Sequence, residues 1–170
     1  MGRVYHASDL HLGHYNILKF SGTLRDGEDV TEHDHYLIQT WNRQVRKRDL
    51  VFVHGDVCMH KSIDIVGELS GRKILIRGNH DELPTIEYLK HFEEVHGIMR
   101  YKGCWLTHAP IHPAELRGKL NVHGHVHANS IRNGYHEYDN RYINVSWEVY
   151  KGLVPHDDIK SGAYYTKRRC

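Results

Sequence analysis

The chain has few cysteines and lacks a long apolar run. Its 170 residues contain three cysteines, Cys58, Cys104 and Cys170, which are scattered and form no Cys-x-x-Cys pair. Such an odd, dispersed set argues against a disulfide framework and favours a reducing compartment. No apolar stretch of about 18 residues exists to span a membrane, and the N-terminus shows no charged-then-apolar signal segment. We therefore expect a cytoplasmic protein without a membrane partner.

A dominant charge sign is also missing. The net charge is +2 with histidine neutral, so the chain has no overall basic field of the kind that marks a nucleic-acid binder. Basic residues gather at Arg46-Lys47-Arg48 and Lys167-Arg168-Arg169, and the first group fits the C-terminal end of a predicted helix. Nucleic acid is thus a possible partner that the charge pattern does not favour, and no pattern predicts an oligomeric state.

Length and composition predict one domain over residues 1–170. A hydrophobic fraction of 39% and a charged fraction of 26% are ordinary for a globular protein, and the chain is too short for a catalytic domain with a large cap. The polar, basic tail over residues 160–170 is expected to be mobile. Histidine is unusually frequent, with seventeen residues. Many of them lie outside the motifs, and seven of these are expected to be ordinary surface or helix-face residues: His33, His35, His60, His91, His96, His136 and His156.

The first half of the sequence alternates short apolar runs with amphipathic segments. A helix is predicted from Thr31, as its N-cap, to Val45, and a second helix over residues 62–70, while residues 23–29 read as a surface loop. This β, α order calls for crossovers and a mainly parallel sheet. From Glu94 the pattern changes, because runs at 95–101 and 104–107 flank Lys102-Gly103 and indicate a hairpin. A second, more antiparallel sheet is therefore expected.

Polar side chains follow five of the predicted strands. Ligands bind at the carboxyl ends of strands in open α/β sheets, so these residues are expected to share one site. Seven of them suit a pair of divalent cations: Asp9, His11, Asp56, Asn79, His108, His125 and His127.

The types and spacing of these residues predict how they would act. Asp56 stands alone after a glycine and is the best candidate for a carboxylate that bridges two ions. In an extended segment His125 and His127 would share a face and serve neighbouring ions, with Gly124 letting the backbone turn into the site. Imidazole, carboxylate and amide ligands together suit Mn, Fe, Zn, Co or Ni, and we favour two Mn ions.

The motifs Asp-x-His, Gly-Asp, Gly-Asn-His-Asp, a lone His and Gly-His-x-His occur in this order over residues 4–127. This order resembles that of the calcineurin-like metallophosphoesterases. The resemblance implies an α/β fold with two packed mixed β-sheets flanked by helices, a four-layer sandwich. It also assigns Asp9, His11 and His127 to one metal. Asn79, His108 and His125 would hold the other, and Asp56 would bridge both.

The same resemblance implies hydrolysis of a phosphoester by a hydroxide that bridges the two metal ions. His80 is then the candidate general acid for the leaving alkoxide, and Asp81 would hold the His80 ring, with capping of the next helix as the alternative role for Asp81. His14 and Asn16 lie close in sequence to two predicted ligands. They could contact substrate or simply pack their loop.

The substrate prediction depends on an arginine that the sequence lacks. Ser/Thr protein phosphatases of the superfamily extend the Gly-Asp motif with an arginine that grips phosphate, and the stretch after Gly55-Asp56 has none. A monoanionic ester suits such a site better than a dianion. We therefore expect a phosphodiesterase acting on small nucleotide-like or cyclic phosphodiesters. The alternatives are a phosphomonoesterase, a nuclease, and a non-catalytic scaffold resembling a subunit of the endosomal sorting complex retromer, which the intact ligand set disfavours.

Overall fold

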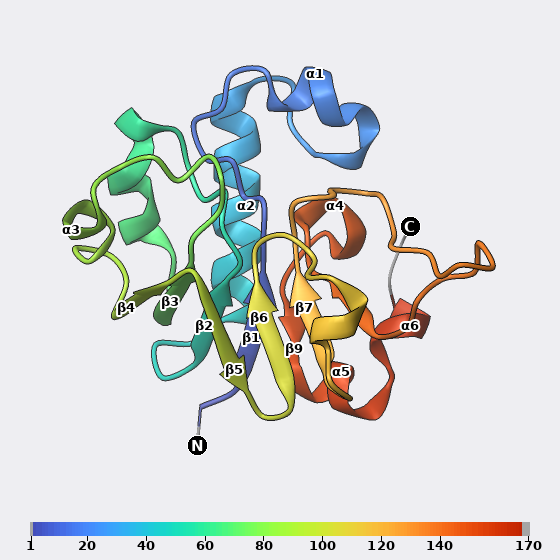
Figure 1. Ribbon diagram of the computed structural model, residues 1–170. Coiled ribbons are helices and arrows are strands. Elements are labelled where there is room, and N and C mark those ends of the chain that lie inside the picture. Colours follow the sequence, from blue (N-terminus) through green and yellow to red (C-terminus); the bar gives the residue numbers. More distant parts are fainter. Residues whose placement is uncertain (1, 168–170) are drawn as a thin grey trace.

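The structure is a computed structural model that describes residues 2–167 (Figure 1). Its first sheet has five strands. The strand order is β4-β3-β2-β1-β9. The bounds are β1 Val4–Ala7, β2 Leu50–Val53, β3 Arg72–Ile76, β4 Glu94–His96 and β9 Val154–Pro155. Strands β1 to β4 pair in parallel, and β9 runs antiparallel to β1. The mainly parallel first sheet predicted from the sequence is confirmed.

The second sheet has the order β5-β6-β7-β8. Its strands are β5 Ile98–Tyr101, β6 Cys104–Thr107, β7 Leu120–His123 and β8 Tyr142–Asn144. The β5–β6 pair is antiparallel and the other two pairs are parallel, so the second sheet is mixed and not mainly antiparallel. Residues 108–119 and 124–141 are long enough for the crossovers that parallel pairs require. Together the two sheets are mixed and are flanked by helices, as expected.

The run at 95–101 is divided between the two sheets. Gly97 separates β4, which pairs with β3, from β5, which pairs with β6. The predicted hairpin therefore begins at Ile98, not at Val95. Its turn is the predicted one, because Lys102 and Gly103 have φ of 44° and 84°, the left-handed values that tight hairpin turns need.

Alternation along the central strands builds two cores. In β2, Val51 and Val53 face the core shared with helix α2, while Phe52 faces the core between the sheets. In β3, Leu75 faces the first core, and Ile74 and Ile76 face the second. A strand buried on both faces reads as a continuous apolar run, which is why these strands were easy to predict.

The remaining elements are short apart from α2. They are α1 Ile17–Ser21, η1 Gly22–Leu24, α2 Val30–Gln44, η2 His60–Glu68, α3 Thr85–Tyr88, η3 Pro113–Glu115, α4 Trp147–Tyr150, α5 His156–Ser161 and α6 Tyr164–Lys167. Asp29, not Thr31, is the N-cap of α2, since its carboxylate accepts hydrogen bonds from the amides of Thr31 and Glu32. The helix predicted over 62–70 is a 3-10 helix that starts two residues earlier.

The tail expected to be mobile is structured as far as it is described. Residues 160–167 complete α5 and form α6, and Tyr164 is buried with its hydroxyl donating to the carbonyl of Asn144 at 2.6 Å. One buried aromatic ring can fix a basic tail to the core. The polar and basic composition of the tail does not predict this contact. Residues 168–170 lie outside the described part. Among the described helices, none is both long and apolar enough to cross a membrane.

A chain of three buried imidazoles runs between the sheets. His54 Nδ1 lies 2.9 Å from the carbonyl oxygen of Thr107, so it must donate, which makes His54 Nε2 the acceptor from His6 Nδ1 at 3.0 Å. His6 Nε2 then accepts from His156 Nδ1 at 3.1 Å. Every ring is thereby fixed as one neutral tautomer. His156, expected at the surface or on a helix face, is the first residue of α5 and is buried.

Acid should weaken the fold through His6. Burial, together with the neighbouring imidazoles, holds the pKa of His6 well below its ordinary value. Below about pH 6.5 the unfolded chain takes up a proton at this residue while the folded chain does not, so the free energy of unfolding falls by about 1.4 kcal/mol per pH unit. Urea unfolding of metal-free protein between pH 8 and 5 should show, in the part of this range below about pH 6.5, a slope steeper by up to this amount than that of His6→Phe.

The exposed His35 on α2 provides the control. Because its side chain is exposed to solvent in the folded chain, His35→Phe should keep the wild-type slope. Equal slopes for wild type and His6→Phe would show that His6 is not held neutral.

Candidate active site

The predicted ligands lie on loops that continue the paired strands. Beyond β1 and β2 the backbone pairing goes on, since the amides of Asp9 and His11 donate to the carbonyls of Gly55 and Asp56, each at 3.0 Å. The backbone nevertheless turns sharply. Five of the seven residues have φ from 50° to 70°, the left-handed region: Asp9, His11, Asp56, His125 and His127. Each such residue costs about 1–2 kcal/mol, and strain of this kind gathers at functional sites.

Two motif glycines allow the carboxylates to approach the backbone. A Cβ on Gly124 would lie 1.9 Å from Ser8 Oγ and 2.4 Å from Asp9 Oδ2. One on Gly78 would lie 2.3 Å from Asp56 Oδ1. Any side chain at these positions would displace a carboxylate, so both glycines are needed for close approach.

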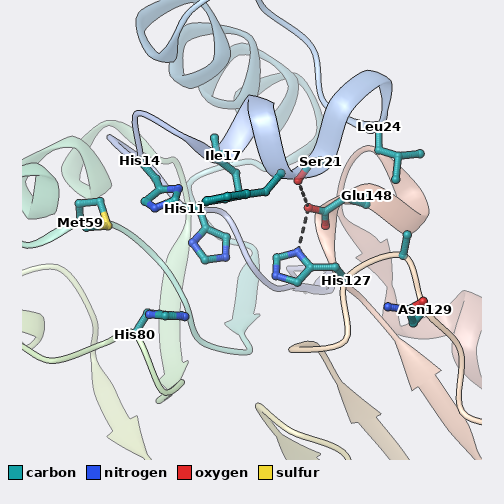
Figure 2. Close-up of a pocket in the computed structure, with 12 residues that line it drawn as sticks. His11, His14, Ile17, Ser21, Leu24, Met59, His80, His127, Asn129 and Glu148 are labelled. Atoms are coloured by element: carbon teal, nitrogen blue, oxygen red, sulfur yellow. Dashed lines mark hydrogen bonds and ion pairs between the residues drawn. The ribbon is translucent and has the colours of Figure 1, made fainter.

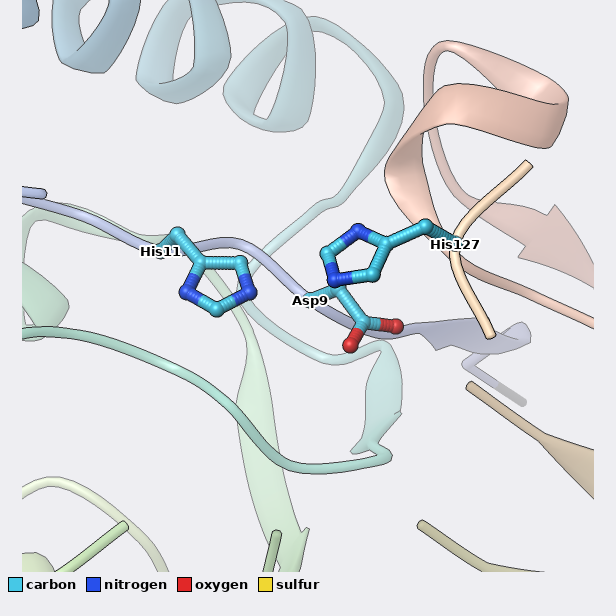
Figure 3. Close-up of side chains that lie close together, drawn as sticks. All are labelled: Asp9, His11 and His127. Carbon is cyan, nitrogen blue, oxygen red and sulfur yellow. The ribbon is translucent and has the colours of Figure 1, made fainter. Parts of the chain in front are cut away.

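Asp9, His11 and His127 form the first cluster (Figure 3). One potential ligand atom from each lies within 4.8 Å of the others. Asp9 is fully buried, and its carboxylate accepts the amide of His125 at 3.0 Å, which ties the end of β1 to the turn after β7. The rings of His11 and His127 are stacked with centroids 5.4 Å apart.

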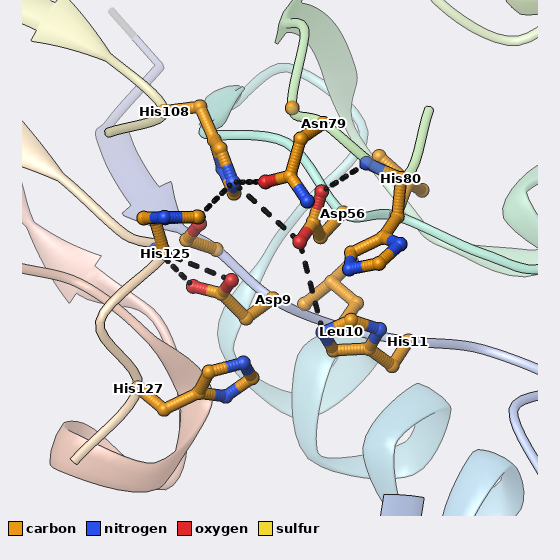
Figure 4. A network of polar contacts seen from close by, with 12 residues as sticks. Asp9, Leu10, His11, Asp56, Asn79, His80, His108, His125 and His127 are labelled. Atoms are coloured by element: carbon orange, nitrogen blue, oxygen red, sulfur yellow. Dashed lines mark hydrogen bonds and ion pairs between the residues drawn. The ribbon is translucent and has the colours of Figure 1, made fainter. Parts of the chain in front are cut away.

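Asp56, His108 and His125 form the second cluster, and Asp56 connects the two (Figure 4). Asp56 Oδ2 lies 3.5 Å from His108 Nε2 and 3.9 Å from His11 Nε2, one atom of each cluster. Asn79 Oδ1 lies 2.9 Å from His108 Nε2 and so joins the second cluster. The structure thus brings the seven residues together in the two groups that the family resemblance implies. His125 and His127 do reach different clusters, but through left-handed turns and not along the extended segment we expected.

Neighbouring acceptors orient the imidazoles. His108 Nδ1 donates to the carbonyl of His54 at 2.7 Å, and His127 Nδ1 donates to Glu148 Oε1 at 3.0 Å. In both rings Nε2 is left to face the site with its lone pair. An outer carboxylate or carbonyl of this kind fixes the tautomer of a ligating histidine and raises its basicity.

Arg25 and Glu148 contact the candidate site, and the sequence analysis did not identify either residue. The Arg25 guanidinium pairs with Glu148 Oε1 at 2.7 Å, donates to the carbonyl of Leu10 at 2.9 Å and also donates to that of Asp9. Although burial raises the pKa of Glu148, His127 and Arg25 lower it to about 2, so this carboxylate is ionised. Glu148 follows β8, so the strand-end rule could have found it.

No pattern marks Arg25, which lies in the stretch interpreted as a surface loop but is buried. His33 is likewise buried and not a surface residue, because its ring bridges Arg25 and Asp34 at 3.0 and 2.9 Å.

The nitrogen and oxygen atoms that face the site are arranged as they would be around bound cations. His108 Nε2 cannot donate while Nδ1 holds the ring proton, yet it faces Asn79 Oδ1 and a carboxylate oxygen of Asp56. His11 Nε2 is buried without a hydrogen-bond partner among the described residues. Lone pairs gathered in this way repel one another unless positive charge lies between them. Divalent ions with affinity for nitrogen and oxygen ligands would satisfy the arrangement.

The expected pairing of Asp81 with His80 is wrong. The Asp81 carboxylate is buried and accepts the backbone amides of Asp56, Val57 and Gly78 at 3.0, 3.0 and 2.7 Å. It does not cap the next helix either, since Pro84 is the N-cap of α3. Its role is to brace the turn that carries Asp56.

The His80 ring lies at the site without the support expected from Asp81. The backbone amide of His80 donates to Asp56 Oδ1 at 3.0 Å, while the exposed ring lines a pocket together with His11 and His127. Its centroid is 5.9 Å from that of His11. The ring nitrogens have no hydrogen-bond partner among the described residues, so they can meet a substrate.

Of the two predicted substrate contacts, only His14 lines this pocket. Asn16 lines an adjoining hollow together with Gly13 and Lys61. Asn16 is also the N-cap residue of α1, although its side chain makes no capping hydrogen bond.

These features define an α/β protein with a pair of candidate metal clusters at the carboxyl ends of its strands. The family model of the calcineurin-like phosphoesterases matches residues 2–166, and the chain belongs to that family. Membership implies hydrolysis of phosphoesters with divalent metal ions.

The relatives leave the substrate open. The chain is 32% identical to the uncharacterised protein MJ1445 of Methanocaldococcus jannaschii over 164 residues, covering 88% of this chain and 84% of the relative. It is 29% identical to the Gene 66 protein of Mycobacterium phage D29, covering 94% and 95%. Among solved structures, the protein of unknown function AQ665 from Aquifex aeolicus has a TM-score of 0.74 at 24% identity, covering 95% and 99%, which supports the fold.

Replacing Asp81 should unfold the chain more easily. An asparagine offers one acceptor oxygen in place of two and turns an amino group toward backbone donors, so Asp81→Asn should lower the free energy of unfolding of metal-free protein by about 1–3 kcal/mol. Urea denaturation measures this. Asp64→Asn is the control, because the Asp64 side chain is 96% exposed and its change should stay within about 0.5 kcal/mol. Unchanged stability in Asp81→Asn would contradict the bracing role.

Proposed function

We propose that the chain is a dinuclear-metal phosphodiesterase that acts on small nucleotide-like phosphodiesters, including cyclic ones. The observation that carries this proposal is the Asp56 carboxylate between His11 and His108, which suits a bridge between two cations. Asp9, His11 and His127 would hold one ion, and Asn79, His108 and His125 the other. We favour Mn, with Fe, Zn, Ni or Co as alternatives. The free, buried thiols of Cys58 and Cys104 support a cytoplasmic setting.

The protein's own residues divide the remaining work. Two bound divalent ions would supply Lewis acidity to the phosphate oxygens and make water more acidic. His80 would donate a proton to the leaving alkoxide, since its ring borders the pocket and has free nitrogens. Buried hydrogen bonds to the backbone around Asp56 hold its carboxylate in place, so little reorganisation is needed when the ions and substrate bind.

Two arginines near the site are turned away from it, which supports a diester substrate. Arg77 donates to the carbonyls of Asp81 and Leu83 at 2.7 and 2.6 Å, and Arg25 is occupied by Glu148 and backbone carbonyls. No lysine or arginine is among the described residues that line the pocket. A dianionic monoester would therefore find no guanidinium to balance its second charge.

Hydrolysis should depend on added metal. Metal-stripped protein should leave bis-p-nitrophenyl phosphate intact, and Mn should restore cleavage more effectively than Mg. The restored rate should exceed that for p-nitrophenyl phosphate, whereas faster cleavage of the monoester would indicate a phosphatase.

Asp56→Asn should lose the paired ions, as measured by metal content. If folded protein that retains two ions cleaves neither ester with any metal tested, the proposal is wrong for these substrates.

His80→Ala tests the general acid. The variant should keep its metal content and lose about 10²–10⁴-fold in kcat on a diester with an alkyl leaving group. The loss should be much smaller for p-nitrophenyl esters, because p-nitrophenolate leaves without a proton. His35→Ala, at an exposed position on α2, is the matched control. Equal rates for His80→Ala and wild type on the alkyl diester would exclude this role.

A further inference from the structure

The pocket beside the metal clusters is much larger than a phosphate group requires. Its volume is about 490 Å³, within the range of small-molecule sites. A phosphate group occupies only a few times the roughly 30 Å³ share of a water molecule. Most of the pocket is thus available to whatever the phosphate is esterified with.

One wall of this pocket is apolar. Ile17 and Phe20 of α1, Leu24 of η1 and Met59 contribute apolar surface to it, and His11, His80 and His127 contribute imidazoles. Figure 2 shows Ile17 and Leu24 on the α1–η1 side, with His11 and His127 facing them from other loops. We call these four residues the apolar wall.

Two members of the apolar wall are unusually open. Phe20 is 76% exposed and Met59 is 42% exposed, yet both border the same pocket. The Phe20 ring also lies 6.0 Å from that of His14, at an angle of 31°. An exposed phenyl ring and a flexible thioether at the mouth of a pocket suit a flat aromatic group, which can stack on the ring and be covered by sulfur.

A side-chain amide in the pocket further restricts the chemical class of group that can bind there. Asn129 lines the pocket beyond His127, and its side-chain amide makes no hydrogen bond to another described residue. A primary amide both donates and accepts, so it can pair with the edge of a heterocycle but gains nothing from an alkyl chain.

We infer that the apolar wall is the binding site for the aromatic heterocycle on one ester arm of the substrate. This inference rests on the proposed function and specifies its substrate class: a nucleoside phosphodiester whose phosphate lies at the metal clusters and whose base stacks on Phe20. Asn129 then contacts the edge of the base.

The test compares two diesters with one leaving group, p-nitrophenyl thymidine 5′-phosphate and methyl p-nitrophenyl phosphate. The thymidine ester should have a kcat/KM at least about tenfold higher, because stacking one base on an aromatic side chain is worth roughly that factor or more. Phe20→Ala should bring the ratio of the two kcat/KM values toward one. Tyr15→Ala is the matched control, since Tyr15 is an equally exposed aromatic residue, at 74%, that lines the adjoining hollow.

Three outcomes would overturn the inference: a ratio near one in wild type, a ratio that Phe20→Ala leaves unchanged, or a still higher kcat/KM for octyl p-nitrophenyl phosphate, which would indicate an aliphatic chain. An NMR titration of metal-free protein with thymidine 5′-monophosphate gives a readout independent of catalysis. The methyl signals of Ile17, Leu24 and Met59 should shift, and shifts confined to other residues would contradict the inference. If neither ester is cleaved, the proposed function fails, and the titration still shows whether the pocket binds a nucleoside base.

Discussion

Unshared electron pairs that face one another are the constraint on which the rest of this structure depends. Asn79, Asp56 and His108 turn lone pairs toward a common space, because His108 donates through Nδ1 to the backbone carbonyl of His54 and therefore carries no proton on Nε2. Such an arrangement is unfavourable without positive charge between the residues. The fold must therefore hold these side chains in place before any ion binds, and much of the chain near the strand ends serves that purpose.

The predicted ligands are held in place by other side chains that bind the backbone segments carrying them. Asp81 holds the turn around Asp56 through three amides, and Arg25 holds the end of β1 while it orients His127 through Glu148. Left-handed backbone at five of the predicted ligands adds strain that these hydrogen bonds help to hold. Because the braces come from distant parts of the chain, the site is fixed by the tertiary fold and not by any one motif.

This arrangement explains what the sequence could predict. The strand ends predicted that seven candidate ligands share one site, because residues that follow buried parallel strands meet at one edge of a sheet. The sequence did not reveal Arg25, and it misassigned Asp81, because a brace is defined by the carbonyl or amide that it reaches and leaves no periodic signal. The split at Gly97 was missed for a related reason, since one apolar run can supply strands to two sheets when a glycine lets the chain bend between them.

The residues proposed for the reaction and those proposed for substrate specificity come from different parts of the chain. The predicted ligands follow the strands and their paired extensions, whereas the apolar wall is supplied mainly by α1 and η1, short elements between β1 and α2. Loops tolerate change better than the elements they join, so the wall can vary while the ligand geometry stays intact. Membership of the family therefore constrains the reaction more tightly than the substrate. For this chain the substrate has to be inferred from Phe20, Met59 and their neighbours, not from the motifs that identify the family.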